Sequence, residues 1–409
     1  MYYPRHITST LEFYLKTFGV VALTGPRQAG KSTLLRHALP RYHYESLDDP
    51  KTLERCEEDP LLFLKDLPRP AIVDEAQRNP KIFPALKAIV DQEPRKKGQW
   101  ILSGSASFGL MQKISESLSG RVGILELLPF SWSEARRKKP SGYLAELLRS
   151  EKIRPPTSSA PVRSTDIPSL SHGFLPGVTL ARTVRAKRAI LASYVTTYVE
   201  KDLRSLANVT DLSTFRRLIT LAAARTGEPV NAHSLASELG VATDTVRRWL
   251  QLLEASYQVF LLPPYFANVG KRVSKTPRMY FFDTGLVSTL TGLEDERLLR
   301  QSTLWGKLFE TWIISEVQKI IFNQRSAAKL FYWRTLAGAE VDLVLEVQGK
   351  LIPIEIKAGP RPASRLLKGI RQFMTDFGEK APFGLVICSI DRPTEIAPKV
   401  FAVSPQYAL

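Results

Sequence analysis

The stretch Gly-Pro-Arg-Gln-Ala-Gly-Lys-Ser-Thr at residues 25–33 limits the possible folds of this chain more than any other part of it. It follows an apolar run at 20–24 and precedes helix-forming residues at 34–38. The spacing G-x-x-x-x-G-K-[ST], placed between a strand and a helix, is that of a phosphate-binding loop. We therefore expect an α/β domain that binds a nucleotide at this loop.

In a loop of this kind, backbone N–H groups and the positive end of the following helix attract phosphate oxygens. We expect Lys31 to reach the β- and γ-phosphates of ATP, and the hydroxyl of Ser32 to bind Mg²⁺. The other predicted nucleotide-binding residues are Gly25, Pro26, Arg27, Gln28, Ala29, Gly30 and Thr33.

The composition restricts the class of protein. A chain of 409 residues is expected to form two or three domains. It lacks an apolar run of the ~18–20 residues that cross a bilayer, and its first residues lack the layout of a secretory signal. Cys56 and Cys388 are its only cysteines, and its histidines show no metal-ligand spacing. These features predict a cytoplasmic protein without a membrane partner.

The formal net charge of +17 favours a polyanionic partner. Lys and Arg side chains attract nucleic acid by releasing its counterions, so nucleic acid is an expected partner, with DNA favoured over RNA. The alternative interpretation is that the charge maintains solubility or neutralises the bound nucleotide.

Between residues 17 and 136, short apolar strands alternate with helix-like stretches, which is typical of a parallel α/β sheet. The expected strands are residues 20–24, 42–47, 71–73, 99–103 and 123–127. We predict four parts of the chain: a P-loop ATPase domain at 1–137, a Pro/Ser-rich linker or inserted loop at 138–170, a helical and winged-helix-like domain at 171–300, and an α/β domain at 301–409.

A helix-turn-helix pattern lies in the predicted middle domain. One helix is expected to end at Gly240, Thr243 is expected to cap the next helix, and a wing is expected near 257–280. Arg247 and Arg248 lie on the exposed face of the second helix and are candidates for contact with DNA phosphates. The alternatives are a solvated helix face or a contact with protein. The predicted buried stripe of this helix comprises Val246, Trp249, Leu250 and Leu253.

An acidic pair follows the predicted strand at 71–73. Asp74 is expected to hold the Mg²⁺ water shell beside Ser32, and Glu75 is the candidate general base that polarises the attacking water. The alternative is a strand that simply ends in a charged turn. Ser103 and Ser105, at the end of the strand at 99–103, are both candidates to position that water.

Arg121 precedes the last predicted strand of this domain. It is a candidate arginine finger, acting in cis or on a neighbouring subunit of a homo-oligomer, or else an ordinary surface arginine. Asp283 in the middle domain is a weaker candidate for a functional residue, because it is equally suited to cap a helix beginning near Gly285.

The phosphate loop, together with Val-Asp-Glu-Ala-Gln, Leu-Ser-Gly-Ser and Leu-Ser-Gly-Arg, resembles the prokaryotic AAA-type ATPases of the archaeal-ATPase-like group. Members of one subfamily carry a C-terminal domain of unknown function. The resemblance extends through the helix-turn-helix pattern and Tyr-Phe-Phe-Asp-Thr-Gly-Leu at 280–286, and it covers nearly all of the chain except the Pro/Ser-rich insert. It implies ATP binding and hydrolysis.

A second group of charged residues lies near the C-terminus. Glu310 falls on a predicted amphipathic helix, and two strands flank Gln348-Gly349 as a hairpin in which Val347 pairs with Lys350. This register sets Asp342 opposite Glu355. Because side chains alternate along a strand, Glu340, Asp342, Glu355 and Lys357 are expected on one face, and Val341, Leu343, Ile354 and Ile356 on the other.

Two carboxylates as close as Asp342 and Glu355 require a bridging cation, so Mg²⁺ is expected there, with Lys357 stabilising charge or activating water. The pattern resembles PD-(D/E)XK, restriction-endonuclease-like nucleases. The alternative is a salt-bridged sheet face in which Glu340 pairs with Lys357. The main functional hypothesis is ATP hydrolysis coupled to nucleic-acid binding or processing. The alternative is an ATP-dependent DNA- or protein-binding switch or remodeller without nuclease activity.

Overall fold

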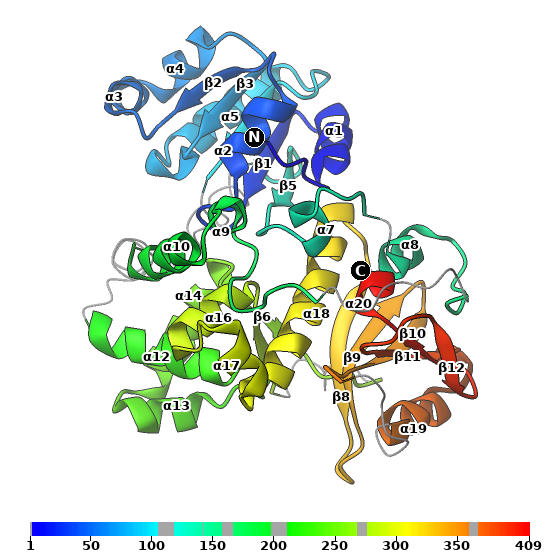
Figure 1. Cartoon of the computed structure of the whole chain (residues 1–409). Helices are drawn as coiled ribbons and strands as arrows, with labels where there is room; N and C mark the ends of the chain where they lie inside the picture. The colour runs from blue at the N-terminus through cyan, green and yellow to red at the C-terminus, as the bar shows by residue number, and fades with distance from the viewer. Residues whose placement is uncertain are drawn as a thin grey trace.

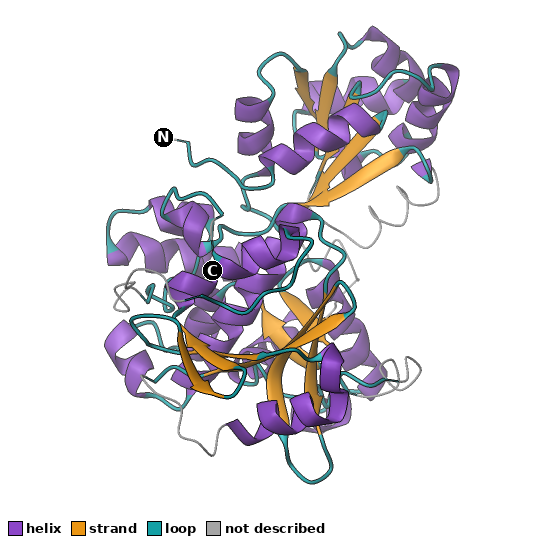
Figure 2. Cartoon of the chain, turned by 90° about the vertical axis from the view of Figure 1, so that its right-hand side faces the viewer, coloured by secondary structure: helices purple, strands orange, loops and turns teal. Residues whose placement is uncertain are grey.

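The computed structural model describes residues 2–104, 118–140, 142–157, 167–197, 211–267, 276–359 and 367–409. The N-terminal sheet and its helices stand apart from the remaining elements, which pack together below them (Figure 1). The same division is visible from the side (Figure 2), where the N-terminal strands point toward the helical part of the molecule.

The N-terminal part is a five-stranded parallel sheet in the order β2-β3-β4-β1-β5. Its strands are β1 (Val20–Thr24), β2 (His43–Ser46), β3 (Ala71–Asp74), β4 (Trp100–Ser103) and β5 (Val122–Glu126), each within one residue of its predicted bounds. Its helices are α1 (Thr8–Thr17), α2 (Lys31–Ala38), α3 (Pro50–Glu58), α4 (Pro60–Asp66), the 3₁₀ turn η1 (Ala76–Arg78) and α5 (Ile82–Gln92).

Helices cover both faces of this sheet, since its strands are apolar on both sides. Val21, Leu23 and Ile72 pack with residues of α1 and α2 on one face. Ala22, Val73 and neighbouring side chains pack with α3, α4 and α5 on the other. The carboxyl ends of the strands therefore remain open at one edge of the sheet, where a doubly covered α/β sheet binds its ligands.

The middle part is mainly helical. Its elements are α7 (Trp132–Ala135), α8 (Tyr143–Arg149), α9 (Pro176–Leu180), α10 (Val184–Thr197), α12 (Leu212–Ala224), α13 (Ala232–Leu239), α14 (Thr243–Ala255), β6 (Val259–Leu262), β7 (Arg278–Phe281), α16 (Thr284–Thr291) and α17 (Glu296–Gln301). Residues 143–149 were expected to belong to a linker or inserted loop. They form the packed helix α8, because Leu144, Leu147 and Leu148 are buried.

The helix-turn-helix pattern corresponds to α13 and α14. Helix α13 ends at Leu239, and its C-cap Gly240 has the left-handed φ of 71° that favours glycine. The expected cap at Thr243 is wrong: Ala242 occupies the N-cap of α14 and makes no side-chain cap bond. The predicted apolar stripe of α14 is buried as expected. Strands β6 and β7 pair antiparallel behind it, and the winged-helix assignment stays a prediction.

The C-terminal part is a six-stranded mixed sheet in the order β12-β13-β11-β10-β9-β8. Its elements are α18 (Leu304–Gln324), β8 (Lys329–Arg334), β9 (Glu340–Val347), β10 (Lys350–Ile356), α19 (Lys368–Phe377), the 3₁₀ turn η4 (Gly378–Lys380), β11 (Gly384–Ile387), β12 (Thr394–Ala397), β13 (Val400–Val403) and α20 (Pro405–Ala408). Side chains of α18 and α19 pack on opposite faces of this sheet.

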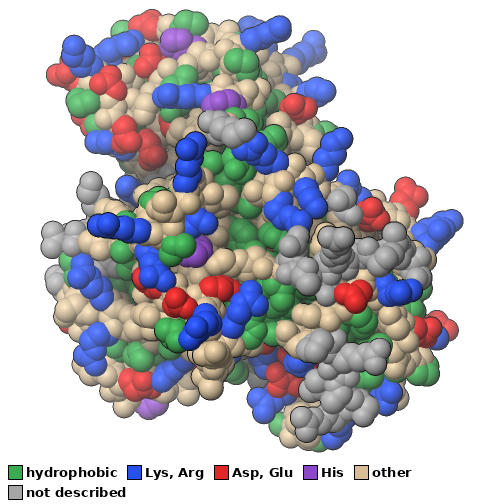
Figure 3. Space-filling model, in the orientation of Figure 1, with side chains coloured by type: hydrophobic (Ala, Val, Ile, Leu, Met, Phe, Trp, Pro, Cys, Tyr) green, Lys and Arg blue, Asp and Glu red, His purple; other side chains and the backbone are tan. Residues whose placement is uncertain are grey.

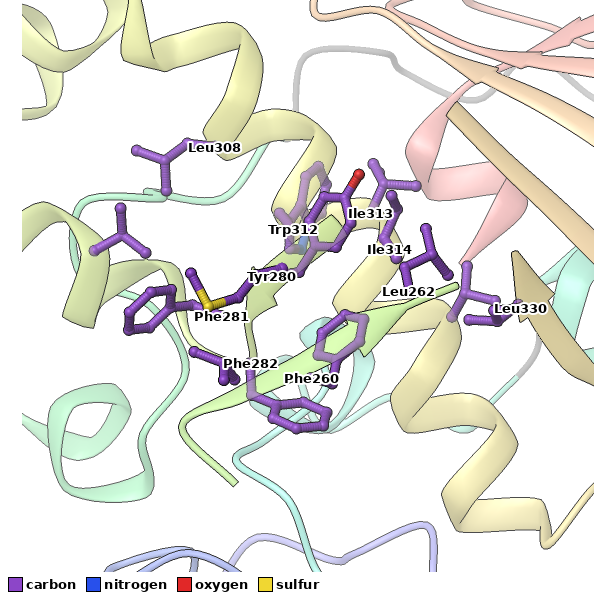
Figure 4. Packing of buried hydrophobic residues seen from close by; sticks show 14 of the residues in the cluster. Phe260, Leu262, Tyr280, Phe281, Phe282, Leu308, Trp312, Ile313, Ile314 and Leu330 are labelled. Atoms are coloured by element: carbon purple, nitrogen blue, oxygen red, sulfur yellow. The ribbon is translucent and has the colours of Figure 1, made fainter. Parts of the chain in front are cut away.

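One apolar cluster joins the middle and C-terminal parts. Figure 4 shows Phe260 and Leu262 of β6 and Tyr280 of β7 packed with Trp312 and Ile313 of α18. Helix α18 lies at the centre of this cluster, and most of its side chains are buried. Among the described residues, every helix is too short or too polar to cross a bilayer.

Candidate functional site

Two glycines determine the shape of the loop that follows β1. Gly25 has φ 143°, and a Cβ added to it would lie 2.1 Å from the carbonyl oxygen of Leu127. Gly30, at the N-cap of α2, has φ 91°. Both backbone conformations are ones that L side chains rarely adopt. The loop therefore wraps tightly around the start of α2, as phosphate binding at a helix N-terminus requires.

Lys31 is nearly buried and is held against this loop. Its ammonium donates hydrogen bonds to the carbonyl oxygens of Gly25, at 3.1 Å, and Pro26, at 2.9 Å. These contacts keep the charged end of the side chain at the loop itself, where phosphate oxygens would be bound.

Ser32 and Asp74 meet because β1 and β3 end at the same edge of the sheet. The Ser32 hydroxyl donates a 2.6 Å hydrogen bond to Asp74 Oδ2, and the backbone N–H of Glu75 donates to Asp74 Oδ1 at 3.1 Å. A serine hydroxyl beside a buried carboxylate is a suitable pair of oxygen ligands for Mg²⁺. The two predicted Mg²⁺ residues are therefore adjacent.

Tyr44 of β2 is a third partner of this pair that the sequence analysis missed. Its hydroxyl donates to Asp74 Oδ2, and the Arg36 guanidinium lies 4.0 Å from the centre of its ring. Burial and the neighbouring Asp74 carboxylate raise the pKa of Tyr44, so the hydroxyl remains a donor. A tyrosine in a strand gives no local signal of this role, because the contact depends on the pairing of β2 with β3.

Glu75 follows β3 with a left-handed φ of 54°. This conformation is uncommon for a residue with a side chain, and such residues are frequent at functional sites. Glu75 lines the same pocket as the phosphate loop, and the side-chain amide of Gln77 donates to its Oε2. Gln77, two residues further along the chain, thus holds the candidate base beside the loop.

Ser103 ends β4, which lies between β1 and β3 in the sheet. Its side chain is 2% exposed, and its hydroxyl has no hydrogen-bond partner within the described part of the chain. A buried hydroxyl without a partner is unusual and fits a role in holding a water or phosphate oxygen. Ser105, the second candidate, lies outside the described residues.

A pocket of about 570 Å³ opens over the phosphate loop, a size typical of small-molecule sites. It is lined by both the N-terminal sheet and the helical middle part. The lining residues are Arg27, Gln28, Gly30, Lys31, Ser32, Thr33, Asp48, Glu75, Pro176, Tyr194 and Thr197. A ligand in this pocket would therefore contact two parts of the molecule.

Arg121 lies away from this site. It precedes β5, whose first residue pairs with Val20, whereas the phosphate loop follows Thr24 at the other end of β1. The length of the strand, about 16 Å, separates them. Arg121 pairs with Asp91, with Nη2 at 3.2 Å from Oδ2. The expectation of a finger acting in cis is therefore wrong, and a role toward a neighbouring subunit stays a prediction.

The C-terminal carboxylates form a second cluster. Val347 pairs with Lys350 across the Gln348-Gly349 turn, as predicted, and the ladder continues to Leu343 opposite Ile354. At its end, Lys357 Nζ lies 3.2 Å from Asp342 Oδ2 and 2.9 Å from Glu355 Oε1. The lysine thus bridges the two carboxylates that were expected to face each other.

An extra residue in β9 changes the predicted faces of this hairpin. Phe331 pairs with Val344 and Trp333 with Val341, so three residues of β9 span two of β8. Such a bulge reverses the alternation of side chains. Val341 packs with Val344 on the α19 side, while Leu343 packs with Ile354 on the α18 side. The assignment of Val341 to the same face as Leu343 is therefore wrong.

Glu310 reaches the cluster from α18, as the sequence analysis proposed. The Tyr280 hydroxyl donates a 2.6 Å hydrogen bond to Glu310 Oε1, and Arg278 Nη1 lies 4.0 Å from the same oxygen. Arg278 also pairs with Glu340, which pairs in turn with Arg334. The predicted alternative pair of Glu340 with Lys357 is therefore wrong, and the sequence analysis missed Arg278 and Tyr280.

The electrostatics of this cluster raise the pKa of two of its carboxyl groups. Burial and the charge of Asp342 raise the pKa of Glu310 to about 8 and that of Glu355 to about 7. Burial alone would lower the pKa of Lys357, but Asp342 and Glu355 raise it above its ordinary value. A cation bound here would displace these protons and lower both pKa values.

The residues present fit a Mg²⁺ ion with few protein ligands. Glu355 Oε2 is buried and has no hydrogen-bond partner among the described residues. Mg²⁺ is usually held by one or two carboxylates and several waters. The described ranges contain no group of three or more His, Cys, Asp or Glu side chains arranged for a metal. Asp342 and Glu355 would therefore hold such an ion with water completing its shell.

Arg247 and Arg248 are exposed on α14, as expected, and Arg247 Nη1 lies 2.9 Å from Asp244 Oδ1 of the same helix. Lys and Arg side chains are spread over the whole visible face of the molecule and are mixed with Asp and Glu (Figure 3). On this face the positive charge does not gather over one element.

The parallel sheet, the glycine-shaped loop and the Ser32–Asp74 contact define a P-loop NTPase domain. A family model described as an AAA domain matches residues 17–136. Two models described as domains of unknown function, DUF8612 and DUF4143, match residues 169–297 and 305–407. The N-terminal part is therefore an AAA-type ATP-binding domain.

The chain is 34% identical over 375 residues to the uncharacterized protein Rv2008c of Mycobacterium tuberculosis and to Mb2031c of Mycobacterium bovis. The match covers 91% of this chain and 77% of each relative, so the chain belongs to the same protein family as these two. Among solved structures, a Walker-type ATPase of Pyrococcus abyssi is similar with 14% identity and a TM-score of 0.44, over 71% of this chain and 96% of that chain.

Proposed function

We propose that the protein hydrolyses ATP with Mg²⁺ at the carboxyl edge of the N-terminal sheet. The observation that carries this proposal is the 2.6 Å contact between Ser32 and Asp74, with Glu75 beside it in the pocket of the phosphate loop. Mg²⁺ would neutralise charge on the phosphates when bound to Ser32 and Asp74. Lys31 and the loop N–H groups would hold the phosphates.

Glu75 is the proposed general base. Its carboxylate would take the proton of a water that attacks the γ-phosphate, and the unpartnered hydroxyl of Ser103 would orient that water. Glu75 follows β3 and Ser103 ends β4, and the proposal is supported by the position of both strands on the same side of β1.

The test compares ATP turnover by the parent protein and by Glu75→Gln. We expect turnover in the parent, and a loss of about 100-fold or more in the variant with ATP binding retained. Glu93→Gln is a matched control, because Glu93 is a half-buried carboxylate of the same domain that is paired with Arg69 and lies outside the pocket of the loop. Equal rates in the parent and Glu75→Gln would remove Glu75 as the base, and absence of ATP turnover in the parent would reject the proposed function.

We further propose that the C-terminal domain binds or processes nucleic acid. Three features support this: the order helix, three strands, helix and strand from α18 to β11; the contact of Lys357 with Asp342 and Glu355; and the net charge of the chain. In this proposal Asp342 and Glu355 would hold Mg²⁺ and Lys357 would stabilise charge that develops on the scissile phosphate.

The alternative is a switch or remodeller without nuclease activity. It is favoured by the ion pairs themselves, since the Lys357 ammonium already pairs with one oxygen of each carboxylate. The test is Mg²⁺-dependent cleavage of duplex DNA, single-stranded DNA and RNA. Nuclease activity predicts cleavage that is lost in Asp342→Ala and Lys357→Ala but retained in Lys31→Ala. Absence of cleavage on all three substrates would leave the switch.

Contact of α14 with DNA is tested separately. If Arg247 and Arg248 neutralise phosphates, replacing each by Ala weakens DNA binding uniformly across sequences and lowers the salt dependence by about one charge each. A salt dependence unchanged from the parent would assign this helix face to solvent or to a protein partner.

A further inference from the structure

Arg5 lies outside every motif of the sequence analysis, yet it is buried against the back of the phosphate loop. Its Nη1 donates a 2.7 Å hydrogen bond to the carbonyl oxygen of Ala29, and its Nη2 donates a 2.6 Å hydrogen bond to that of Leu128. The side chain is only 5% exposed. Arg5 thus ties the loop to the segment that follows β5.

The contact with Ala29 has a direct effect on the loop. In a trans peptide the C=O and the next N–H point in opposite directions. Arg5 holds the Ala29 carbonyl toward the back of the loop, so the N–H of Gly30 is turned toward the side where phosphate would bind. Arg5 therefore fixes the orientation of one of the donors on which phosphate binding depends.

Arg5 is itself fixed by a buried carboxylate. Its Nε lies 3.1 Å from Glu134 Oε1 of α7, and Glu134 also accepts hydrogen bonds from the backbone N–H groups of His6 and Ser131. Although burial opposes ionisation, the charge of Arg5 and these donors hold the pKa of Glu134 below its ordinary value. The pair is therefore ionic at neutral pH.

A second buried ion pair forms hydrogen bonds with the segment that follows β5, from the side of α18. Glu316 and Lys319 of α18 are 2% and 1% exposed and lie 2.8 Å apart. Glu316 Oε2 accepts from the backbone N–H of Trp132 at 2.8 Å, and Lys319 Nζ donates to the carbonyl of Phe130 at 3.0 Å. Phe130 also packs its ring 4.8 Å from the Arg5 guanidinium.

The segment at 128–135 is thus held between Arg5, which contacts the loop, and α18, which carries Glu310. Glu310 precedes Glu316 by six residues, about 9 Å along the helix. Figure 1 shows α7 of this segment beside α18. Buried charges with fixed partners resist displacement, since a broken pair leaves an unpaired charge inside the protein. We therefore expect a shift of the loop to move this segment and α18 together.

We propose that Arg5 is a positioning residue of the ATP site, and that the segment 128–135 links the phosphate loop through Glu316 and Lys319 to the helix that carries Glu310. The inference rests on the proposed binding of ATP. It adds a residue that no motif of the sequence analysis contains, and a route by which nucleotide state reaches the C-terminal carboxylates.

The test measures the affinity of the full chain for ATP and ADP with Mg²⁺. Arg5→Gln is expected to weaken both by about 10- to 100-fold, because a charged hydrogen bond to the loop is lost. Arg5→Lys keeps the charge but not the fork that reaches two carbonyls, and it is expected to fall between the parent and Arg5→Gln. Affinity equal to the parent in either folded variant would overturn the role of Arg5.

The link to α18 is tested with Glu316→Gln combined with Lys319→Met, which removes both charges and keeps the volume. We expect ATP affinity to fall by about three- to tenfold, although neither residue lines the pocket. Lys307→Gln is the matched control: it breaks the ion pair of α18 with Glu228, a residue between α12 and α13 that lies outside the pocket of the loop. Parental affinity in the double variant would overturn the link.

These outcomes are separable from failure of the proposed function. A parent that bound neither nucleotide would reject ATP binding itself. A parent that binds ATP while Arg5→Gln binds it equally well would reject only the role of Arg5. Melting temperatures without nucleotide identify an unfolded Arg5→Gln, in which case the affinity of Arg5→Lys decides.

Discussion

The phosphate loop and the carboxylate cluster are the two candidate sites of the molecule, and they are built differently. The loop depends on backbone: Gly25 and Gly30 adopt conformations that glycine allows, and Lys31 contacts backbone carbonyls. The cluster depends on side chains from several elements, with Lys357, Asp342, Glu355 and Glu310 interacting across β9, β10 and α18.

This difference decides what each site tolerates. A backbone site keeps its shape while side chains around it vary, and it fails when a glycine is replaced. A side-chain cluster keeps its backbone but changes its charge with pH and with each substitution. The two sites are therefore compared best by making the same substitution, such as Lys→Ala or Gly→Ala, in each of them.

The largest difference is expected between the variants of the two lysines. Lys31→Ala removes the ammonium at the phosphate loop, and we expect ATP turnover to fall by about 1000-fold. Lys357→Ala is the counterpart in the cluster and is expected to leave ATP turnover within about twofold of the parent. A large loss of ATP turnover in Lys357→Ala would show that the cluster takes part in ATP hydrolysis itself.

The next effect concerns two of the glycines with positive φ, one in the phosphate loop and one in the hairpin turn of the cluster. Gly25→Ala places a Cβ against the Leu127 carbonyl, so we expect a loss of stability on the order of 3 kcal/mol together with loss of nucleotide binding. Gly349→Ala, at the hairpin turn, meets no atom within 4 Å and should cost only about 1 kcal/mol. Denaturant unfolding measures both, and equal losses would contradict the steric argument.

A smaller effect is expected from pH at the cluster. The pKa of Glu310 is raised to about 8, so the folded state holds a proton there that the unfolded state releases above its ordinary pKa. Stability from this group is present at low pH and is lost as pH rises through 8, by on the order of 2 kcal/mol between pH 5.5 and 7.5. Glu310→Gln should flatten this dependence in urea unfolding. A parent and variant with parallel pH profiles would contradict the raised pKa.

The smallest effect is expected for Arg121. It is half-exposed and pairs with Asp91 at the far edge of the sheet, so Arg121→Ala should leave ATP binding unchanged. Turnover should also be unchanged at protein concentrations low enough to keep the chain monomeric. A loss of turnover that appears only at high concentration would support a finger donated to a neighbouring subunit.

The sequence predicted which residues of the N-terminal candidate site lie close together, because they follow one another at the ends of strands. Residues 25–33 and Asp74–Glu75 each lie within one local motif, and a parallel sheet brings the ends of its strands to one edge. Tyr44 and Arg5 escaped prediction since their contacts depend on how separate segments pack. No spacing in the sequence relates Arg5 to Ala29 or to Glu134.

The sequence predicted correctly which residues of the carboxylate hairpin pair with each other. It did not predict correctly which face of the sheet each side chain lies on. The two-residue turn determines which residues are opposite, and Val347 does pair with Lys350. The bulge in β9 arises from its pairing with β8, a contact between strands whose alignment the hairpin does not set. Asp283 shows the opposite case: it caps α16 through the N–H groups of Gly285 and Leu286, as one reading of the local sequence proposed.

Helix α18 also bears on how proteins of this kind exchange their parts. The family match at 305–407 begins inside this helix, as if the C-terminal part were a detachable unit. If that unit were joined to a different ATPase, it would carry the Glu316–Lys319 pair. The pair would then lack its hydrogen bonds with the Trp132 N–H and the Phe130 carbonyl. Recombination is therefore expected to succeed only when the segment before α8 travels with the C-terminal part.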